Sequence, residues 1–323
     1  MEEPALVLKD AVVRYHRLTA VDGVTLELRR GETLGLVGES GCGKSSIARS
    51  IVGLQPLASG TLSVDGESVR AGTRRKASDA QSRVQLLFQD PAASLSPRLT
   101  VKTLLAEPLK IRNVYTAERF AEIVALAESL GLGQQLLTRY PHQLSGGQAR
   151  RVALVRALAA NPSIIVADEP TAGLDISVQG ELLNLLRGLR DRLGLSYLLI
   201  SHNLNVVGRV TDRVAVMYLG QIVESGPTAS LFREPAHPYT QALLSANLTL
   251  DPSRQRERIV LTGELPNPSN PPSGCRFHKR CPVAQPKCAA DAPPLLAGTG
   301  ARSVACHFPL VSAEPIPRQA IAG

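Results

Sequence analysis

The first candidate for chemistry is a glycine-rich run, Gly38-Glu39-Ser40-Gly41-Cys42-Gly43-Lys44-Ser45. It fits the spacing G-x-x-x-x-G-K-[ST], in which backbone N–H groups wrap phosphates and the N-terminus of the next helix favours anions. In this role Lys44 reaches the β- and γ-phosphates and the Ser45 hydroxyl binds Mg²⁺. The alternative is an ordinary glycine-rich turn between a strand and a helix. The match predicts a nucleotide site made by Gly38, Ser40, Gly41, Cys42, Gly43, Lys44, Ser45 and Ser46.

A second candidate is the pair of carboxylates at the end of the apolar run 163–167. Asp168 and Glu169 would lie at the carboxyl edge of a parallel sheet, where the ligands of open α/β sheets bind. We expect Asp168 to hold Mg²⁺ through water and Glu169 to orient or deprotonate the water that attacks a phosphate. An Asp-Glu pair alone is more often a helix cap. The phosphate loop upstream favours the catalytic interpretation.

Strands that alternate with helices must position these groups. The run 6–15 and the run 24–29 alternate apolar and polar residues, as half-buried strands do. The runs 33–37 and 197–200 are apolar throughout, like 163–167, and predict buried central strands. An apolar stripe at helical spacing over 178–189 predicts a helix packed on the sheet. This order of elements predicts an α/β fold with a mainly parallel core sheet.

The middle and the end of the chain differ from this core. A strand over 84–88 precedes a stretch rich in helix signals, such as Thr116 as a cap and Gly131 as a stop. We therefore expect residues 92–160 to form a helical subdomain inserted into the core. A hairpin over 221–225 and short helices should follow, and then a proline-rich linker over 265–272 that cannot be regular helix. We place a nucleotide-binding domain at 1–250 and a linker with a Cys-rich extension at 251–323.

Composition excludes several classes of protein. Of 323 residues 44% are apolar but only 3% are aromatic, with no Trp, so an aliphatic core is expected. The net charge of +8 suits nucleic acid or an anionic membrane surface, or merely solubility. No run reaches the roughly 18 apolar residues of a membrane-spanning helix. The acidic start, Met1-Glu2-Glu3-Pro4, is unlike a signal peptide, so we expect the chain to stay in the cytosol.

The run Leu144-Ser145-Gly146-Gly147-Gln148, which opens a helix, resembles the signature of the ATP-binding cassette (ABC) ATPases. Four other features follow the order of that superfamily. Gln89 resembles its Q-loop glutamine and Asp175 its D-loop aspartate. His202 resembles the switch histidine that follows a strand, and Tyr15 resembles the aromatic residue that stacks on adenine.

The ABC resemblance implies a P-loop NTPase fold with an N-terminal antiparallel β subdomain. It implies catalytic roles for Lys44, Gln89, Glu169 and His202, with Gln89 also near Mg²⁺. By the same resemblance, Ser145 and Gly147 contact the γ-phosphate held by a partner's phosphate loop, with Gly146, Gln148 and Asp175 beside them. Two ATP molecules would then be sandwiched between two ATPase subunits.

A narrower resemblance covers roughly residues 5–310. The runs 38–45, 88–98 and 237–244, together with Gly263-Glu264-Leu265-Pro266, are similar to the ATPase subunits of bacterial dipeptide/oligopeptide importers. Two positions depart from that family: Ala149-Arg150 usually reads Arg-Gln, and Asn203 is usually Asp. Neither departure removes a catalytic group.

The importer resemblance implies the partners and the location. Such a subunit would lie on the cytoplasmic face of the inner membrane, pair with a second ABC ATPase subunit as a heterodimer, and drive two permease subunits. An extracytoplasmic binding protein would supply the peptide. Import of nickel, opines or glutathione stays open, as does an ABC ATPase that acts on nucleic acid, which would explain the +8 charge.

The last feature is a set of cysteines after the linker: Cys275, Cys281, Cys288 and Cys306. Four thiolates on a short segment can enclose a metal or a cluster, but the spacing lacks the C-x₂-C pairs of zinc ribbons. In the importer family such cysteines are associated with a [4Fe–4S] cluster, a chemistry that four thiolates suit. Zinc, or no metal at all, remains an alternative. Cys42 is expected to have no redox role.

Overall fold

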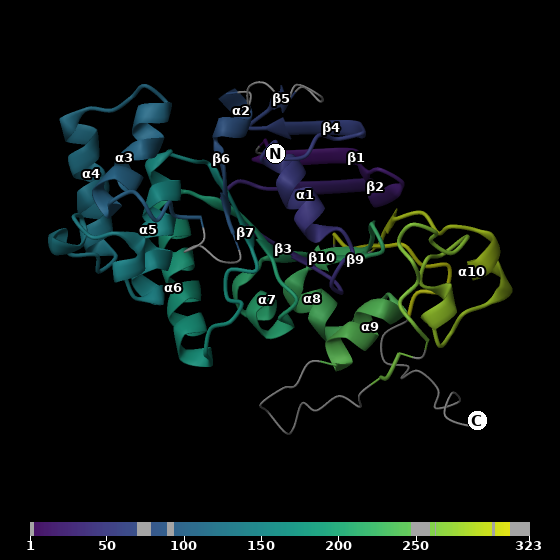
Figure 1. Ribbon diagram of the computed structural model, residues 1–323. Coiled ribbons are helices and arrows are strands. Elements are labelled where there is room, and N and C mark those ends of the chain that lie inside the picture. The colour runs from purple at the N-terminus through teal and green to yellow at the C-terminus, as the bar shows by residue number, and fades with distance from the viewer. Residues whose placement is uncertain are drawn as a thin grey trace.

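The computed structural model describes residues 3–69, 79–88, 94–246, 259–261, 263–298 and 301–310. In this part of the chain two sheets form, with helices between and around them (Figure 1). The larger sheet has the strand order β11-β12-β10-β9-β3-β8-β7-β6. Its strands are β3 (Thr33–Val37), β6 (Val84–Leu87), β7 (Ile164–Asp168), β8 (Ser196–Ile200), β9 (Arg213–Tyr218), β10 (Gln221–Pro227), β11 (Leu296–Ala297) and β12 (Ser303–Val304).

The centre of the larger sheet is parallel, as the apolar runs predict. β3 pairs with β8 and β9, and β7 pairs with β8 and β6, all in parallel. Every residue of β3 and β8 is buried, because both faces of the sheet are covered. At one edge β10, β12 and β11 continue the sheet in antiparallel fashion. The predicted α/β class with a mainly parallel core is confirmed.

The smaller sheet is antiparallel, with the order β2-β1-β4-β5. Its strands are β1 (Leu6–Tyr15), β2 (Leu18–Leu28), β4 (Ser59–Val64) and β5 (Glu67–Val69). β2 begins at Leu18, earlier than the predicted 24, because its first half lacks a clear alternation. Helix α1 (Lys44–Ile51) lies between the two sheets (Figure 1), where Ile47 and Ile51 are fully buried. This packing fixes the N-terminus of α1, and with it the phosphate loop.

A helical arm projects from one side of the core (Figure 1). After the short α2 (Asp79–Ser82) and β6, it comprises α3 (Val101–Ile111), α4 (Ala117–Ser129), two short 3₁₀ turns (Gln134–Leu136 and Pro141–Gln143) and α5 (Gly146–Ala159). The Thr116 hydroxyl accepts a hydrogen bond from the Arg119 N–H (3.2 Å), which is the predicted cap. Leu104, Leu105, Val152 and Val155 form the centre of its aliphatic core.

Four more helices cover the larger sheet: α6 (Ile176–Leu193), α7 (Leu204–Val210), α8 (Thr228–Arg233) and α9 (Pro238–Ser245). The C-terminal extension, which we define as the described residues of 259–310, lies on the side of the core away from the arm (Figure 1). It contains the 3₁₀ turn His278–Arg280, α10 (Pro286–Ala290), β11 and β12. None of the helices in the described ranges is long and apolar enough to cross a membrane.

Candidate active site

The glycine-rich run forms the turn between β3 and α1, as predicted. Gly38 and Gly43 have φ angles of 155° and 113°, in a region that favours glycine. A Cβ atom at Gly38 would collide with the carbonyl oxygen of Met217, and one at Gly43 with that of Ala20. Both positions therefore require glycine for conformation and for space. The backbone can curl tightly here only because these two residues lack side chains.

Lys44 is buried inside this turn. Its Nζ donates hydrogen bonds to the carbonyl oxygens of Gly38 (2.8 Å) and Glu39 (2.9 Å). It also lies 3.6 Å from the Sγ of Cys42, which is buried behind the loop. Burial raises the pKa of the Cys42 thiol, against the opposing effect of Lys44. A raised pKa keeps this thiol protonated at neutral pH.

A cavity of about 510 Å³ opens in front of the loop. It brings together ten of the predicted site residues: Tyr15, Ser40, Gly41, Gly43, Lys44, Ser45, Ser46, Asp168, Glu169 and His202. Gly38 and Cys42 belong to the same loop but do not line the cavity. Gln89 falls outside the described residues. One cavity is thus lined by residues of the phosphate loop, by Tyr15 as the candidate adenine contact, and by the carboxylates of Asp168 and Glu169.

Asp168 ends β7, at the carboxyl edge of the sheet where the sequence places it. Burial raises the pKa of its carboxyl group, and the Glu169 carboxylate adds to the rise, against the effect of hydrogen bonding with Ser45. Its Oδ1 is a buried acceptor without a hydrogen-bond partner in the described part of the chain. A buried, unpaired carboxylate oxygen beside a hydroxyl is a donor set that suits a hard cation such as Mg²⁺.

Glu169 and His202 form a direct pair. The Oε1 of Glu169 lies 2.8 Å from the Nδ1 of His202 and also accepts the backbone N–H of His202 (3.0 Å). The Glu169 side chain is 15% exposed and that of His202 69%, so the histidine lies on the solvent side. Glu169 has a φ of 51°, which is uncommon for a residue with a side chain. Its N–H donates to the carbonyl of Ile200 (2.9 Å), which holds this conformation.

The signature residues lie elsewhere, at the exposed N-terminus of α5. The Ser145 hydroxyl accepts from the Gln148 N–H (3.2 Å), and the Ser145 N–H donates to the Gln148 side chain (3.0 Å). This is a reciprocal capping box. Gly146 and Gly147 are exposed beside it. None of these four residues lines the cavity around Lys44.

Asp175 is also exposed and caps a helix. Its carboxylate accepts hydrogen bonds from the Val178 N–H (3.0 Å) and the Ser177 hydroxyl (2.8 Å), and these hydrogen bonds lower its pKa. It stays ionised at the start of α6. Like the signature residues, it does not line the cavity.

Sequence reasoning missed several contacts of the site. Leu18 and Ala20 of β2 form part of the cavity wall. The Tyr239 hydroxyl accepts the N–H of Glu39 (2.9 Å), and Arg280 pairs with the Glu39 side chain. No local signal pointed to Tyr239 and Arg280, because they lie 200 and 241 positions from Glu39 in the sequence.

The four C-terminal cysteines converge in the extension. Burial raises the pKa of Cys281 to about 12 and that of Cys306 to about 11, and the neighbouring thiolates add to both. Cys275 and Cys288 lie in the same group, since the Cys275 N–H donates to the Cys288 carbonyl (2.8 Å). No group of three or more His, Cys, Asp or Glu among the described residues is arranged to hold a metal ion. The four cysteines thus lie near one another, but the described residues show no metal site and do not support the predicted [4Fe–4S] cluster.

Comparisons with known proteins identify the family of the chain. Residues 21–172 match the family model of the ABC transporter, and residues 223–288 match that of the oligopeptide/dipeptide transporter C-terminal region. Among solved structures, cbiO1 from Clostridium perfringens, part of the ABC transporter complex cbiONQ, aligns with a TM-score of 0.64 at 26% identity. The alignment covers 72% of this chain and 91% of that one. The fold and the site thus define an ABC transporter ATPase, an enzyme that hydrolyses ATP to drive transport.

Curated relatives narrow the class. The dipeptide transport ATP-binding protein DppF of Haemophilus influenzae is 44% identical over 301 residues, 93% of this chain and 92% of that protein. The oligopeptide transport ATP-binding protein AppF of Bacillus subtilis is 45% identical over 293 residues, 90% and 89% of the two chains. The chain belongs to the ATP-binding subunits of the oligopeptide/dipeptide ABC transporter family.

Proposed function

We propose that the chain is the ATP-hydrolysing subunit that powers import of di- and oligopeptides through partner membrane subunits. One observation carries the ATPase part: a single cavity joins the phosphate loop, Asp168 and the hydrogen-bonded pair Glu169–His202. Peptide as cargo is supported by the relatives, which are named for dipeptide and oligopeptide transport. Nickel, opine or glutathione cargo is the alternative within the family.

The phosphate loop binds the triphosphate. Backbone N–H groups between Gly38 and Ser46 face the phosphates, and the N-terminus of α1 adds a favourable dipole. Lys44, already anchored on two loop carbonyls, places its ammonium beside the β- and γ-phosphates. Tyr15, which lines the same cavity, stacks on adenine. Gln89 is proposed to join the catalytic group and the Mg²⁺ shell.

Mg²⁺ fits between Ser45 and Asp168. The Oδ1 of Asp168 has no hydrogen-bond partner among the described residues, and the Ser45 hydroxyl lies beside the same carboxylate, so two oxygen ligands are available to the ion. Bound there, the ion would neutralise charge on the phosphate oxygens. Asp168 would hold the ion, and the Ser45 hydroxyl would bind it from the phosphate loop.

Glu169 is the base in this proposal. Its carboxylate accepts a proton from the water that attacks the γ-phosphate, and His202 fixes the Oε1 of that carboxylate. The test is Glu169→Gln, which keeps the shape of the side chain but removes its basicity. Hydrolysis should fall by about 10²–10⁴-fold while ATP stays bound, and Lys44→Ala should abolish binding itself. Undiminished hydrolysis in the Glu169→Gln variant would remove Glu169 from this role.

The exposed signature serves a second subunit. Ser145, Gly146, Gly147, Gln148 and Asp175 lie away from this chain's cavity, so they are available to complete the site of a partner ATPase subunit, which we propose to be a different chain. Among the described residues, nothing beyond the chain neighbours and the backbone of α5 itself lies within 4 Å of a Cβ built on Gly147. Gly147→Asp should therefore fold normally and bind ATP. It should stop hydrolysis by the assembled transporter, because a carboxylate would face the partner's phosphates.

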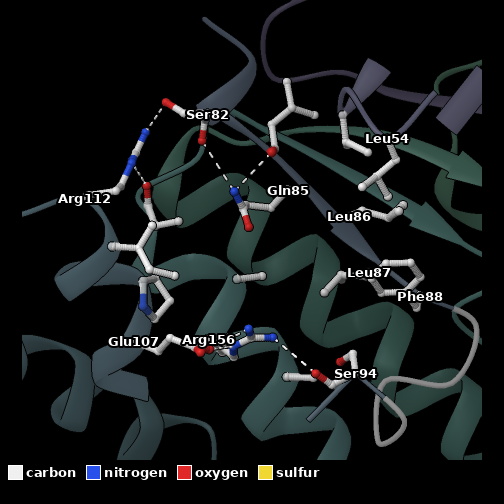
Figure 2. A pocket seen from close by; sticks show the side chains of 17 residues that line it. Leu54, Ser82, Gln85, Leu86, Leu87, Phe88, Ser94, Glu107, Arg112 and Arg156 are labelled. Carbon is white, nitrogen blue, oxygen red and sulfur yellow. Dashed lines mark hydrogen bonds and ion pairs between the residues drawn. The ribbon is translucent and has the colours of Figure 1, made fainter. Parts of the chain in front are cut away.

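Permease subunits are proposed to dock on a second cavity, of about 370 Å³, between the arm and the core (Figure 2). Leu54, Phe88 and Ile111 on its rim are 62%, 45% and 73% exposed. Glu107 and Arg156 form an ion pair (2.7 Å) in its wall, so the wall is preformed. An apolar helix end from a membrane subunit fits such a surface. Ile111→Glu should release the permease subunits and leave ATP binding intact, and Ile111→Val is the matched control.

The location follows from these partners: the subunit lies at the cytoplasmic face of the inner membrane, bound to permeases that receive peptide from a substrate-binding protein. Uptake of labelled dipeptide by vesicles that hold the whole transporter tests the cargo. If nickel, opine or glutathione inhibited this uptake and unlabelled peptide did not, the inhibiting compound would be favoured as the cargo. Salt-sensitive binding to DNA, without associated permeases, would favour a role on nucleic acid.

The cysteines are proposed to bind a [4Fe–4S] cluster, ligated by Cys275, Cys281, Cys288 and Cys306. The four thiols lie near one another. Around a single Zn²⁺ each sulfur lies at about 2.3 Å from the ion. A four-iron cluster is larger than one ion, so its four cysteine sulfurs lie farther from one another. Anaerobic purification should give a brown protein with iron, sulfide and absorbance near roughly 400 nm. Cys281→Ser should lose the colour, and Cys42→Ser, outside the group, should keep it. A colourless, iron-free wild type would contradict the cluster.

A further inference from the structure

Three arginines of the extension pair with carboxylates of the ATPase core. Arg276 pairs with Asp22, Arg280 with Glu39 (2.8 Å), and Arg302 with Glu224 (2.8 Å). All three guanidinium groups are largely buried, with side chains 10–18% exposed. Of these three pairs, only the pair between Arg280 and Glu39 involves the phosphate loop, because Glu39 is the second residue of the run 38–45.

The contact between Arg280 and Glu39 is bidentate. The two guanidinium nitrogens of Arg280 donate to the two carboxylate oxygens at 2.8 and 3.1 Å, a geometry that fixes direction as well as distance. Arg280 also donates to the Tyr218 hydroxyl (3.4 Å) and lies over that ring, 5.9 Å from its centroid. Burial disfavours its charge, but the hydrogen bonds to Glu39 and Tyr218 outweigh that cost and raise the pKa of Arg280.

Glu39 is thus held through both its backbone and its side chain. Its N–H donates to the Tyr239 hydroxyl (2.9 Å), and its carboxylate is held by Arg280. Its carbonyl oxygen in turn accepts from the Nζ of Lys44 (2.9 Å). The residue that positions the phosphate-binding lysine is thus positioned by the extension.

The charge of Glu39 gives this contact a functional consequence. A free carboxylate on an anion-binding loop would repel the phosphates bound by that loop. The guanidinium of Arg280 neutralises this charge and draws it to the side of the loop that faces the extension. Attachment of the extension to the core does not require the pair between Arg280 and Glu39, because Arg276 and Arg302 also bind the core.

We propose that Arg280 is a positioning residue of the nucleotide site, which neutralises Glu39 and fixes the phosphate loop for ATP. The C-terminal extension is then a working part of the ATP site rather than an appendage. This inference rests on the proposed ATP site.

The test is a double-mutant cycle on the full-length chain, with the Kd for Mg-ATP measured by calorimetry. Arg280→Gln should raise the Kd by about tenfold, because it leaves a carboxylate unpaired beside the phosphates. Adding Glu39→Gln to that variant should bring the Kd back to within about twofold of wild type, since the repelling charge is gone. The loss in the Arg280→Gln variant should be larger for ATP than for ADP, which carries one negative charge fewer.

Two controls separate a charge effect from a structural one. Arg302→Gln breaks another ion pair of the extension, with Glu224, away from the cavity; it should lower Tm and leave the Kd unchanged. Arg280→Lys keeps the charge without the bidentate contact and should bind ATP better than Arg280→Gln. Melting curves check that each variant is folded.

The outcomes are distinct. A wild-type Kd in the Arg280→Gln variant, or a double variant no tighter than Arg280→Gln alone, would overturn the role of Arg280. If wild type bound ATP no better than Lys44→Ala, the proposed ATP site would fail, and the role of Arg280 would fail with it.

Discussion

The helical arm and the C-terminal extension lie on different sides of the same core (Figure 1), and different contacts hold them there. The arm packs through aliphatic side chains such as Leu104, Val152 and Val155, all essentially unexposed. In the described part of the extension the buried apolar residues are Phe277, Cys288 and Ala305. The extension relies instead on arginine pairs and on a ring cluster, in which Phe277 contacts Tyr218 and Tyr239.

This difference suits two tasks. Aliphatic contacts are not directional, so an aliphatic interface tolerates small shifts of one body against another. In the proposed assembly, the arm would therefore be suited to present its exposed signature to a second subunit. Bidentate ion pairs and ring contacts have preferred geometries. The extension is thus suited to fix residues of its own subunit, among them Glu39 in the phosphate loop.

Phe277→Ala should have the largest effect on the folded chain. It removes a ring that is 1% exposed, and such truncations cost about 3–5 kcal/mol of the free energy of unfolding. Because Phe277 packs on Tyr239, whose hydroxyl holds the Glu39 N–H, ATP binding should also weaken. Denaturant unfolding and an ATP titration measure the two effects, with Phe277→Leu as the milder control. Unchanged ATP affinity in a destabilised variant would uncouple the extension from the loop.

Leu104→Ala tests the arm in the same way. Leu104 is fully buried, and its truncation should cost about 2–4 kcal/mol, with the exact value set by how far the cavity collapses. Here the Kd for ATP should not change, since none of the residues around Leu104 lines the ATP cavity. If this variant weakened ATP binding as much as Phe277→Ala, the contrast between the two regions would be wrong.

Lowering the pH should destabilise the protein through His237, which lies at the contact between α9 and the extension. Burial lowers the pKa of this histidine from 6.5 to about 3, while its Nδ1 accepts the Tyr239 N–H (3.0 Å) and its ring contacts Phe277. The unfolded chain takes up a proton near pH 6.5 and the folded chain does not. The free energy of unfolding should therefore fall as the pH drops from about 6.5 to about 3, by up to about 1.4 kcal/mol per unit.

The matched variant for this effect is His237→Asn, which can still cap α9 but does not titrate. Its stability should depend less steeply on pH in that window, as measured by urea unfolding at several pH values. Equal slopes for wild type and variant would show that His237 is not the group responsible.

The features predicted from the sequence are those that neighbouring residues determine. The phosphate loop needs glycines at fixed spacing, and buried parallel strands such as β3 and β8 are continuous apolar runs, so both were predicted with nearly correct bounds. The Thr116 cap is equally local. Asp168 and Glu169 were placed correctly because the carboxyl ends of parallel strands share one edge.

The rest depends on contacts between distant residues, which one sequence does not encode locally. β11 and β12 have two residues each, too few for any periodicity, yet they extend the main sheet, because β12 pairs with β10 and β11 pairs with β12. Arg280 lies 241 positions after Glu39, and nothing in the run around it distinguishes it from a solvated arginine. The hydrogen bond from His202 to Glu169 likewise arises from the adjacency of β7 and β8.

The smallest predicted effect concerns the tip of the arm. Ser145→Ala removes the hydroxyl that accepts the Gln148 N–H and should cost about 1 kcal/mol of stability, as the loss of a helix cap usually does. Ser145→Asp keeps a cap and should restore that stability. Both variants should bind ATP as wild type does, because Ser145 does not line the cavity. A shift in the Kd for ATP in the single chain would show that the signature acts within its own subunit, and the division of tasks between the arm and the extension would fail at this point.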